Sequence, residues 1–131
     1  MVEEEPTSGP PASNPADDAR LWRLALLVVL GAAAFRLLLS VLVPLFPDET
    51  YYWEWSRRPA ASYFDHPPGI AWLIGLGTSI LGDTRAGIRL GPALAGIVGS
   101  LALLFTARRI AGGRAALVTA AVLACMPLAT A

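Results

Sequence analysis

The chain has 131 residues, of which 55% are hydrophobic and 15% charged, whereas soluble domains average about 45 to 50% apolar and about 25% charged residues. Its ten acidic and ten basic side chains cancel, so no overall charge would attract nucleic acid or another polyion. A single cysteine, Cys125, excludes an intrachain disulfide and a cysteine-rich metal cluster. The composition argues against a disordered chain or a soluble nucleic-acid-binding protein and favours a membrane protein.

The chain changes character near residue 20. Residues 1–19 hold five acidic side chains and four prolines with little to bury, which predicts a disordered tail. Residues 21–46 carry only Arg23 and Arg36 as charges. As a helix they would extend about 39 Å, beyond the roughly 30 Å of hydrocarbon in a bilayer. We predict the first membrane span in this run.

A secretory signal peptide is the alternative interpretation of the same run. Two arginines precede an apolar stretch that contains the pair Ala32-x-Ala34, as in a cleavable leader. The apolar sequence resumes at Leu37, however, and the tail in front of it is acidic. Both features favour a membrane span.

Three later runs are also uncharged. Residues 90–107 and 115–131 are each long enough to cross the bilayer as a helix. Residues 68–82 would reach only about 22 Å and include several glycines, so we expect a helix that lies at the interface or re-enters. A full span is the alternative for this segment, and it would place everything after Asp83 on the opposite side.

The short loops indicate the orientation. Three arginines and no acidic residue lie between the runs 90–107 and 115–131, so the positive-inside bias places this turn and the tail in the cytoplasm and the loop of residues 47–89 outside. The last run ends without a polar flank, and we expect further helices of the same protein. We therefore predict an all-α polytopic protein of a bacterial inner or plasma membrane, with residues 20–131 as the N-terminal part of its membrane domain.

Arg36 lies inside the first predicted span. An arginine near the middle of a span costs roughly 2.5 to 3.5 kcal/mol on insertion scales. It should therefore face the interior of a helix bundle and meet a lipid phosphate or a carboxylate of another helix. A structural pairing and a ligand role both fit this position.

The outer loop is rich in acidic and aromatic side chains. Asp48 is followed at helical spacing by Tyr51, Tyr52 and Trp55, so all four share one helix face. A carboxylate beside aromatic rings suits a sugar, because the acid takes a hydroxyl proton while the rings cover apolar sugar faces. Two structural alternatives stay open: Asp48 is the N-cap of this helix, or the aromatic residues form an interfacial belt.

A second motif lies at residues 63–69. Pro67 keeps His66 out of helical geometry, and Pro68 suits the first turn of the next helix. The imidazole would then lie beside a helix N-terminus, where it could donate to a phosphate together with backbone N–H groups. Alternatively, Asp65 and His66 only brace a turn. As a lone histidine, His66 offers no metal-ligand cluster.

These residues occur in a defined order along the chain. The order is Pro47-Asp48-Glu49-x-x-Tyr52, then Tyr63-x-x-His66-Pro67-Pro68, then Gly82-Asp83 and Arg89. It resembles the N-terminal part of integral-membrane glycosyltransferases of the GT-C fold, above all family 39 and the aminoarabinose-transferase-like group, which includes the dolichyl-phosphate-mannose protein mannosyltransferases. The resemblance covers about residues 20–131.

The resemblance implies a transferase that takes a sugar from a polyprenyl-phosphate carrier on the outer side of the membrane. The sugar passes, usually with inversion, to a hydroxyl of a protein, lipid or glycan. The implied catalytic residues are Asp48, as general base or orienting group, and Glu49, which supports it. The implied substrate-binding residues are Tyr52, Tyr63, His66 and Arg89. Many relatives have lysine where this chain has His66, which keeps a donor but makes its charge depend on pH.

No cofactor is implied, and a divalent cation would need ligands beyond Asp48 and Glu49. The implied partners are the lipid-linked sugar donor, the acceptor and membrane lipid, without nucleic acid. Two other classes stay open. The small-residue stripe from Gly91 to Gly99 fits a small membrane interaction or assembly protein. Arg36 and the segment 68–82 fit part of a transporter.

Overall fold

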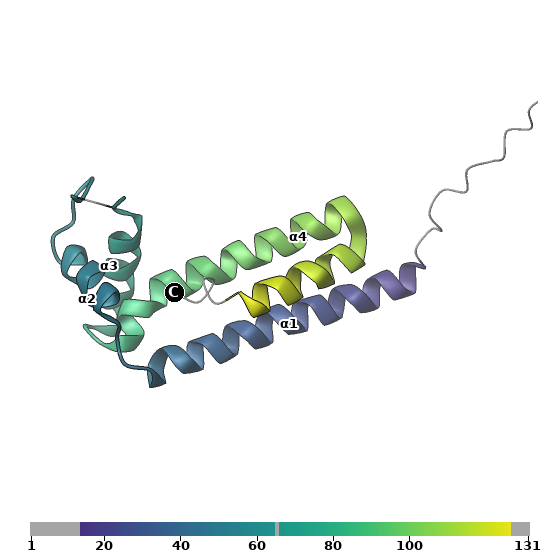
Figure 1. Cartoon of the computed structure of the whole chain (residues 1–131), viewed down its shortest axis with the longest axis horizontal. Coiled ribbons are helices and arrows are strands. Elements are labelled where there is room, and N and C mark those ends of the chain that lie inside the picture. Colours follow the sequence, from purple (N-terminus) through teal and green to yellow (C-terminus); the bar gives the residue numbers. More distant parts are fainter. Residues whose placement is uncertain (1–13, 65, 127–131) are drawn as a thin grey trace, which may run out of the picture.

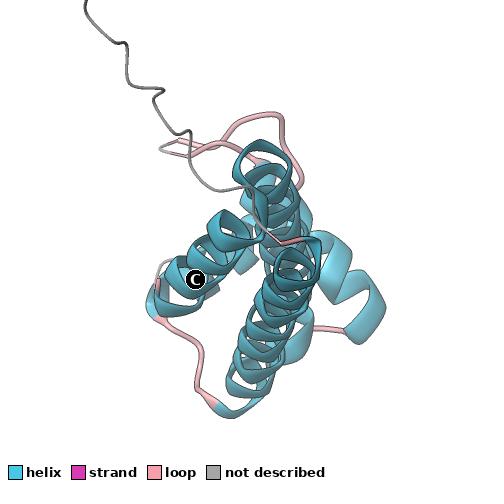
Figure 2. Ribbon diagram, turned by 90° about the vertical axis from the view of Figure 1, so that its right-hand side faces the viewer, coloured by secondary structure: helices cyan, strands magenta, loops and turns pink. Residues whose placement is uncertain are grey.

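The computed structural model describes residues 14–64 and 66–126, and every regular element within them is a helix (Figures 1 and 2). The helices in chain order are α1 (Pro15–Leu42), α2 (Pro47–Ser56), α3 (Gly69–Leu81) and α4 (Arg85–Cys125). Helices α1 and α4 are both long and apolar enough to cross a membrane. The predicted all-α membrane fold is confirmed.

Helix α1 begins earlier and ends earlier than the sequence pattern indicates. The Asn14 side chain accepts a hydrogen bond from the backbone N–H of Ala16 (3.1 Å), and a proline and two acidic residues follow in the first turn. These are favourable helix-start residues, so residues 15–19 are helical and the predicted tail is too long. The helix ends at Leu42 because Pro44 keeps Val43 extended.

Helix α4 consists of two antiparallel arms, as Figure 1 shows. The backbone leaves helical geometry at Ala111 and at Gly112, where φ is 77°, a conformation that glycine adopts without a Cβ clash. The first arm contains the predicted span 90–107, and the second arm contains residues 115–125 of the predicted span 115–131. Residues 127–131 lie outside the described part of the chain, so the end of the last span stays a prediction.

The two arms pack against α1, and Asp18 closes the turn between them. The buried cluster between α1 and the two arms consists of Ala25, Val29, Leu104, Ala116 and Ala120. Asp18 of α1 accepts a hydrogen bond from the backbone N–H of Gly113 and lies 3.9 Å from Arg108. The Arg108 guanidinium also lies 4.4 Å from the ring centroid of Trp22. Asp18 therefore caps the second arm of α4 from a different helix, a contact that local sequence does not predict.

Arg36 finds its partners at the end of α4. Its Nη2 donates to the carbonyl oxygens of Leu123 (2.6 Å), Ala124 (3.3 Å) and Met126 (3.4 Å). The last carbonyls of a helix lack partners within the helix, and the helix dipole favours a cation there. Arg36 therefore has a structural pairing, with a helix end in place of the expected phosphate or carboxylate.

Helix α3 packs on the first arm of α4 through glycines. A Cβ at Gly77 would collide with the backbone oxygen of Gly87, and a Cβ at Gly91 would collide with that of Leu73. The opposite face of α3 exposes Trp72, Leu76 and Ile80. With 13 residues, α3 is shorter than the roughly 20 that a membrane span needs, which favours the interfacial or re-entrant interpretation of this segment.

Replacing Gly91 by alanine should destabilise the contact between α3 and α4, because the added methyl group meets the Leu73 backbone, which has no rotamer to change. We expect a loss of about 1 to 3 kcal/mol, the usual cost of overpacking, measured as a lower midpoint of thermal unfolding in detergent. Gly99→Ala is the matched control, since nothing lies within 4 Å of its Cβ position. Equal stability of the two variants would contradict this packing.

Candidate functional site

Helix α2 carries both acidic residues of the predicted site in its first turn. Its N-cap is Phe46, whose backbone N–H donates to Oε2 of Glu49 (2.8 Å). The alternative that Asp48 is the N-cap is therefore wrong, because Glu49 supplies the capping carboxylate. Asp48 is exposed, and within the described residues it has no hydrogen bond or ion pair to another side chain or backbone group.

Glu49 and Arg89 form a two-pronged ion pair. Nε of Arg89 donates to Oε1 of Glu49 and Nη2 donates to Oε2, both at 2.5 Å. The other guanidinium hydrogens reach the backbone carbonyls of Ser40 (2.6 Å), Val43 (3.0 Å) and Pro44 (3.0 Å). An arginine side chain has five N–H donors, and in Arg89 each has an acceptor. The structure thus brings two predicted site residues, Glu49 and Arg89, together, and they bind each other.

This pair changes the proton affinity of Glu49. Burial by itself raises the pKa of the Glu49 carboxyl, but the hydrogen bonds from Arg89 and from the Phe46 N–H, together with the charge of Arg89, lower it by more. The net pKa lies below the ordinary value of 4.5. Glu49 is therefore ionised at neutral pH and is a poor proton acceptor.

The aromatic side chains of the loop form one cluster around Trp55. The Tyr63 ring stacks on Trp55, with centroids 4.6 Å apart and planes within 2° of parallel. Tyr51 lies 4.5 Å from Trp55 and Tyr52 lies 5.4 Å from it, and His66 follows at 5.8 Å. The prediction that Tyr51, Tyr52 and Trp55 share one face of α2 is confirmed, and the place of Asp48 on that face stays a prediction.

The Tyr63 hydroxyl braces the end of α2. It lies 2.9 Å from the carbonyl oxygen of Trp55 and 3.0 Å from that of Arg58, and it accepts from the Ala60 N–H (3.3 Å). A substrate contact through this hydroxyl would require these bonds to break. The ring of Tyr63, stacked on Trp55, remains the part that belongs to the aromatic cluster.

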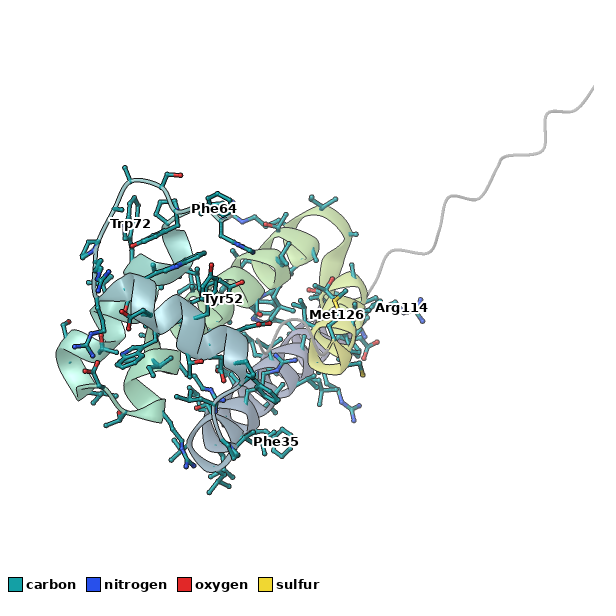
Figure 3. The ribbon with its side chains drawn as sticks, turned by 60° about the vertical axis from the view of Figure 1, so that its left-hand side comes forward. Phe35, Tyr52, Phe64, Trp72, Arg114 and Met126 are labelled. Carbon is teal, nitrogen blue, oxygen red and sulfur yellow. The ribbon has the colours of Figure 1, made fainter. Side chains whose placement is uncertain are left out.

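A hollow of about 310 Å³ opens beside the cluster. It is lined by Tyr52, His66, Pro67, Gly69 and Ile70. Two predicted binding residues, Tyr52 and His66, therefore share one wall, with ring centroids 5.5 Å apart. Helix α3 begins at this wall, at Gly69. In Figure 3, Tyr52 and Phe64 lie toward Trp72 and away from Arg114.

Asp83 holds the C-terminal half of α2, and the sequence analysis did not predict this role. Its Oδ1 accepts from the indole N–H of Trp53 (2.9 Å), and its Oδ2 lies 3.6 Å from Arg57. The Arg57 guanidinium lies 5.0 Å from the Trp53 ring centroid. The only sequence signal was the Gly82-Asp83 pair of the family pattern, and a residue type does not reveal a partner 30 positions away.

The described residues contain no group of three histidine, cysteine, aspartate or glutamate side chains that could hold a metal ion. A cation held by Asp48 and Glu49 would need further ligands and would compete with Arg89 for the Glu49 oxygens. Asp65, the expected partner of His66 in bracing the turn, lies outside the described residues.

These features define a helical membrane protein whose acidic and aromatic side chains gather in the segment that joins its two long apolar helices. The chain belongs to the family of dolichyl-phosphate-mannose-protein mannosyltransferases, which residues 65–131, just over half of its length, match. The resemblance to membrane glycosyltransferases of the GT-C fold is thereby confirmed.

Individual relatives agree with this family. A lipid A galacturonosyltransferase of Rhizobium johnstonii is 36% identical over 93 residues, which cover 69% of this chain and 20% of the relative. An undecaprenyl phosphate-alpha-4-amino-4-deoxy-L-arabinose arabinosyl transferase of Edwardsiella ictaluri is 34% identical over 79 residues, covering 51% and 14%. A protein of the same name, numbered 2, of Pseudomonas fluorescens is 31% identical over 120 residues, covering 78% and 21%.

The chain thus spans about a fifth or less of the length of these relatives. No solved structure matches it.

The ion pair of Glu49 predicts how stability depends on pH. Because the folded-state pKa of Glu49 is lowered, its contribution is fully present above the unfolded-state value and is lost as the pH falls through the folded-state value. We expect the difference in unfolding midpoint between wild type and Glu49→Gln to be constant from about pH 7 to 5 and to shrink in more acidic buffer. Thermal unfolding in detergent at a series of pH values measures this difference.

Glu54→Gln is the control for that experiment, since its partner Arg58 is exposed and 3.9 Å away, and such pairs contribute little. A gap between wild type and Glu49→Gln that persists unchanged at about pH 3 would mean that the shape of Glu49, not its charge, stabilises the fold.

Proposed function

We propose that the protein containing this chain is a membrane glycosyltransferase that moves a sugar from a polyprenyl-phosphate carrier to an acceptor hydroxyl on the extracytoplasmic side, with inversion. The observation that carries the proposal is the position of Asp48. It is an exposed carboxylate without a partner among the described residues. It lies four residues before Tyr52, and thus on the same side of α2, and Tyr52 lines the hollow.

In the proposed reaction, an acceptor hydroxyl attacks the anomeric carbon of the donor sugar. Asp48 takes the hydroxyl proton as the new carbon–oxygen bond forms. The bond from the anomeric carbon to the phosphate oxygen breaks, and polyprenyl phosphate leaves with the electron pair. Attack from the face opposite the leaving group inverts the anomeric centre.

The lining of the hollow fits a sugar phosphate. Aromatic rings such as Tyr52 cover the apolar face of a sugar, and His66 stands at the start of α3. There an imidazole N–H and the first backbone N–H groups of a helix can donate to a phosphate. The names of the relatives support this donor class, because two of them are named for undecaprenyl phosphate-linked aminoarabinose. The third is named for lipid A, which supports a lipid acceptor.

Asp48→Asn should abolish transfer in the full gene product, because an amide cannot take the acceptor proton. We expect turnover to fall by about 10²- to 10⁴-fold, the usual contribution of general base catalysis. The measurement is transfer of labelled sugar from a polyprenyl-phosphate donor in isolated membranes, normalised to the amount of folded protein. Asp17→Asn is the matched control, since Asp17 is also an exposed aspartate and lies in the first turn of α1, on a different helix from Asp48.

Retained turnover in Asp48→Asn would remove Asp48 from the mechanism. If the wild-type protein inserts into membranes but transfers no sugar from any polyprenyl-phosphate donor, the alternative of a membrane interaction or assembly protein gains support.

His66→Ala should weaken donor binding, because the hollow loses its imidazole donor beside the start of α3. A hydrogen bond to a charged group contributes about 1.5 to 3 kcal/mol, so we expect the KM for the donor to rise about tenfold or more, with a smaller change in kcat. His66→Gln keeps an N–H donor, so its donor KM should lie between those of the wild type and His66→Ala. An unchanged donor KM in His66→Ala would limit His66 to bracing its turn.

A further inference from the structure

We propose that Glu49 and Arg89 are positioning residues, which hold Asp48 in place and do not themselves touch the donor or the acceptor. This inference rests on the proposed function, since it assigns to Asp48 the proton transfer described above. It differs from the pattern of the family resemblance, in which Glu49 is counted with the catalytic residues and Arg89 with the binding residues. The geometry of the two side chains is the reason for the reassignment.

Arg89 has no N–H donor left for a ligand. Its five N–H groups all have acceptors within the chain: both oxygens of Glu49 and the carbonyls of Ser40, Val43 and Pro44. The side chain of Arg89 is only 13% exposed. A phosphate could bind it only by displacing a carboxylate or a carbonyl that is already in hydrogen-bonding position, which makes Arg89 poorly suited to donor binding.

The two neighbouring carboxylates, Asp48 and Glu49, have different surroundings. Glu49 is 27% exposed, and its oxygens accept from Arg89 and from the Phe46 N–H. Asp48 is exposed, and nothing in the described chain pairs with it. When adjacent carboxylates have such different surroundings, their roles differ accordingly. The paired one fixes geometry, and the exposed one is available to a substrate proton.

The pair of Glu49 and Arg89 joins three helices. The carbonyl groups of Ser40 and Val43 lie at the end of α1, where the helix itself provides no N–H donors for them. Arg89 lies in the second turn of α4 and Glu49 in the first turn of α2. A single guanidinium therefore connects three helices at the residue next to Asp48.

The other end of α2 is held independently. Asp83 binds Trp53 and Arg57 there, so α2 is fixed at both ends and Asp48 has little freedom to move with it. A displacement of about 1 Å at a reacting group can cost on the order of 10² in rate. Loosening the pair of Glu49 and Arg89 should therefore lower kcat through Asp48 while leaving the hollow, and donor binding, intact.

The test uses Arg89→Lys and Glu49→Gln in the full gene product, with kcat and the donor KM measured separately per folded molecule. Lysine keeps the charge of Arg89 but cannot form the planar fork. We expect kcat to fall about 100-fold in Arg89→Lys, with the donor KM within twofold of wild type and a smaller loss in Glu49→Gln. Arg85→Lys is the matched control, since Arg85 is an exposed arginine one turn earlier in α4.

A double-variant comparison separates positioning from a general loss of stability. If Arg89 acts through Asp48, adding Arg89→Lys to Asp48→Asn should lower turnover little further, because the group being positioned is already gone. Independent, multiplicative losses would overturn the inference. So would a donor KM that rises with kcat unchanged, which would return Arg89 to donor binding and leave the proposed function standing.

A third result would also overturn it: a lower yield of folded protein with normal kcat per folded molecule, which would make the pair purely structural. Failure of the proposed function has a different signature, because the wild-type protein itself then transfers no sugar from a polyprenyl-phosphate donor. If the wild type is active and Asp48→Asn keeps its turnover, Asp48 leaves the mechanism and the positioning role of Glu49 and Arg89 falls with it.

Discussion

An arginine that is mostly buried needs acceptors for five N–H groups, and Arg89 finds all of them where α1 ends, α2 begins and α4 starts. Much of the site follows from this one requirement. Arg89 donates to carbonyls at the end of α1 that the helix itself leaves unpaired, and it fixes Glu49, the capping carboxylate of α2. It also keeps Glu49 ionised through its charge and hydrogen bonds. The acidic turn is therefore held in place by a residue 40 positions away.

A second constraint sets how closely α3 approaches α4. Only glycine at Gly77, Gly87 and Gly91 lets the two backbones meet, because a Cβ at each position would collide with backbone atoms of the other helix or of the turn. With α3 packed this closely on α4, the start of α3 lies beside the aromatic cluster, and Gly69 and His66 line the hollow together with Tyr52. Helix packing and site geometry are thus parts of the same arrangement.

The sequence predicted well what depends on local pattern. Hydropathy located the long helices, the spacing from Asp48 to Trp55 predicted the shared aromatic face, and the two prolines after His66 predicted a helix start close by. Boundaries were less accurate. Residues 15–20 are helical because Asn14 caps them, whereas the acidic and proline-rich composition around Asn14 predicted a tail.

The sequence by itself determined the helical membrane class, the family and the residues that gather between the first two apolar runs, because hydrophobic length and ordered motifs are properties of the linear chain. Only the tertiary structure decided which polar groups are paired. Arg36 meets a helix end, Asp18 caps a distant arm, and Glu49 is held by Arg89. These partners are chosen by proximity after packing, since each polar group that leaves water takes the acceptors or donors that the neighbouring helices bring within reach.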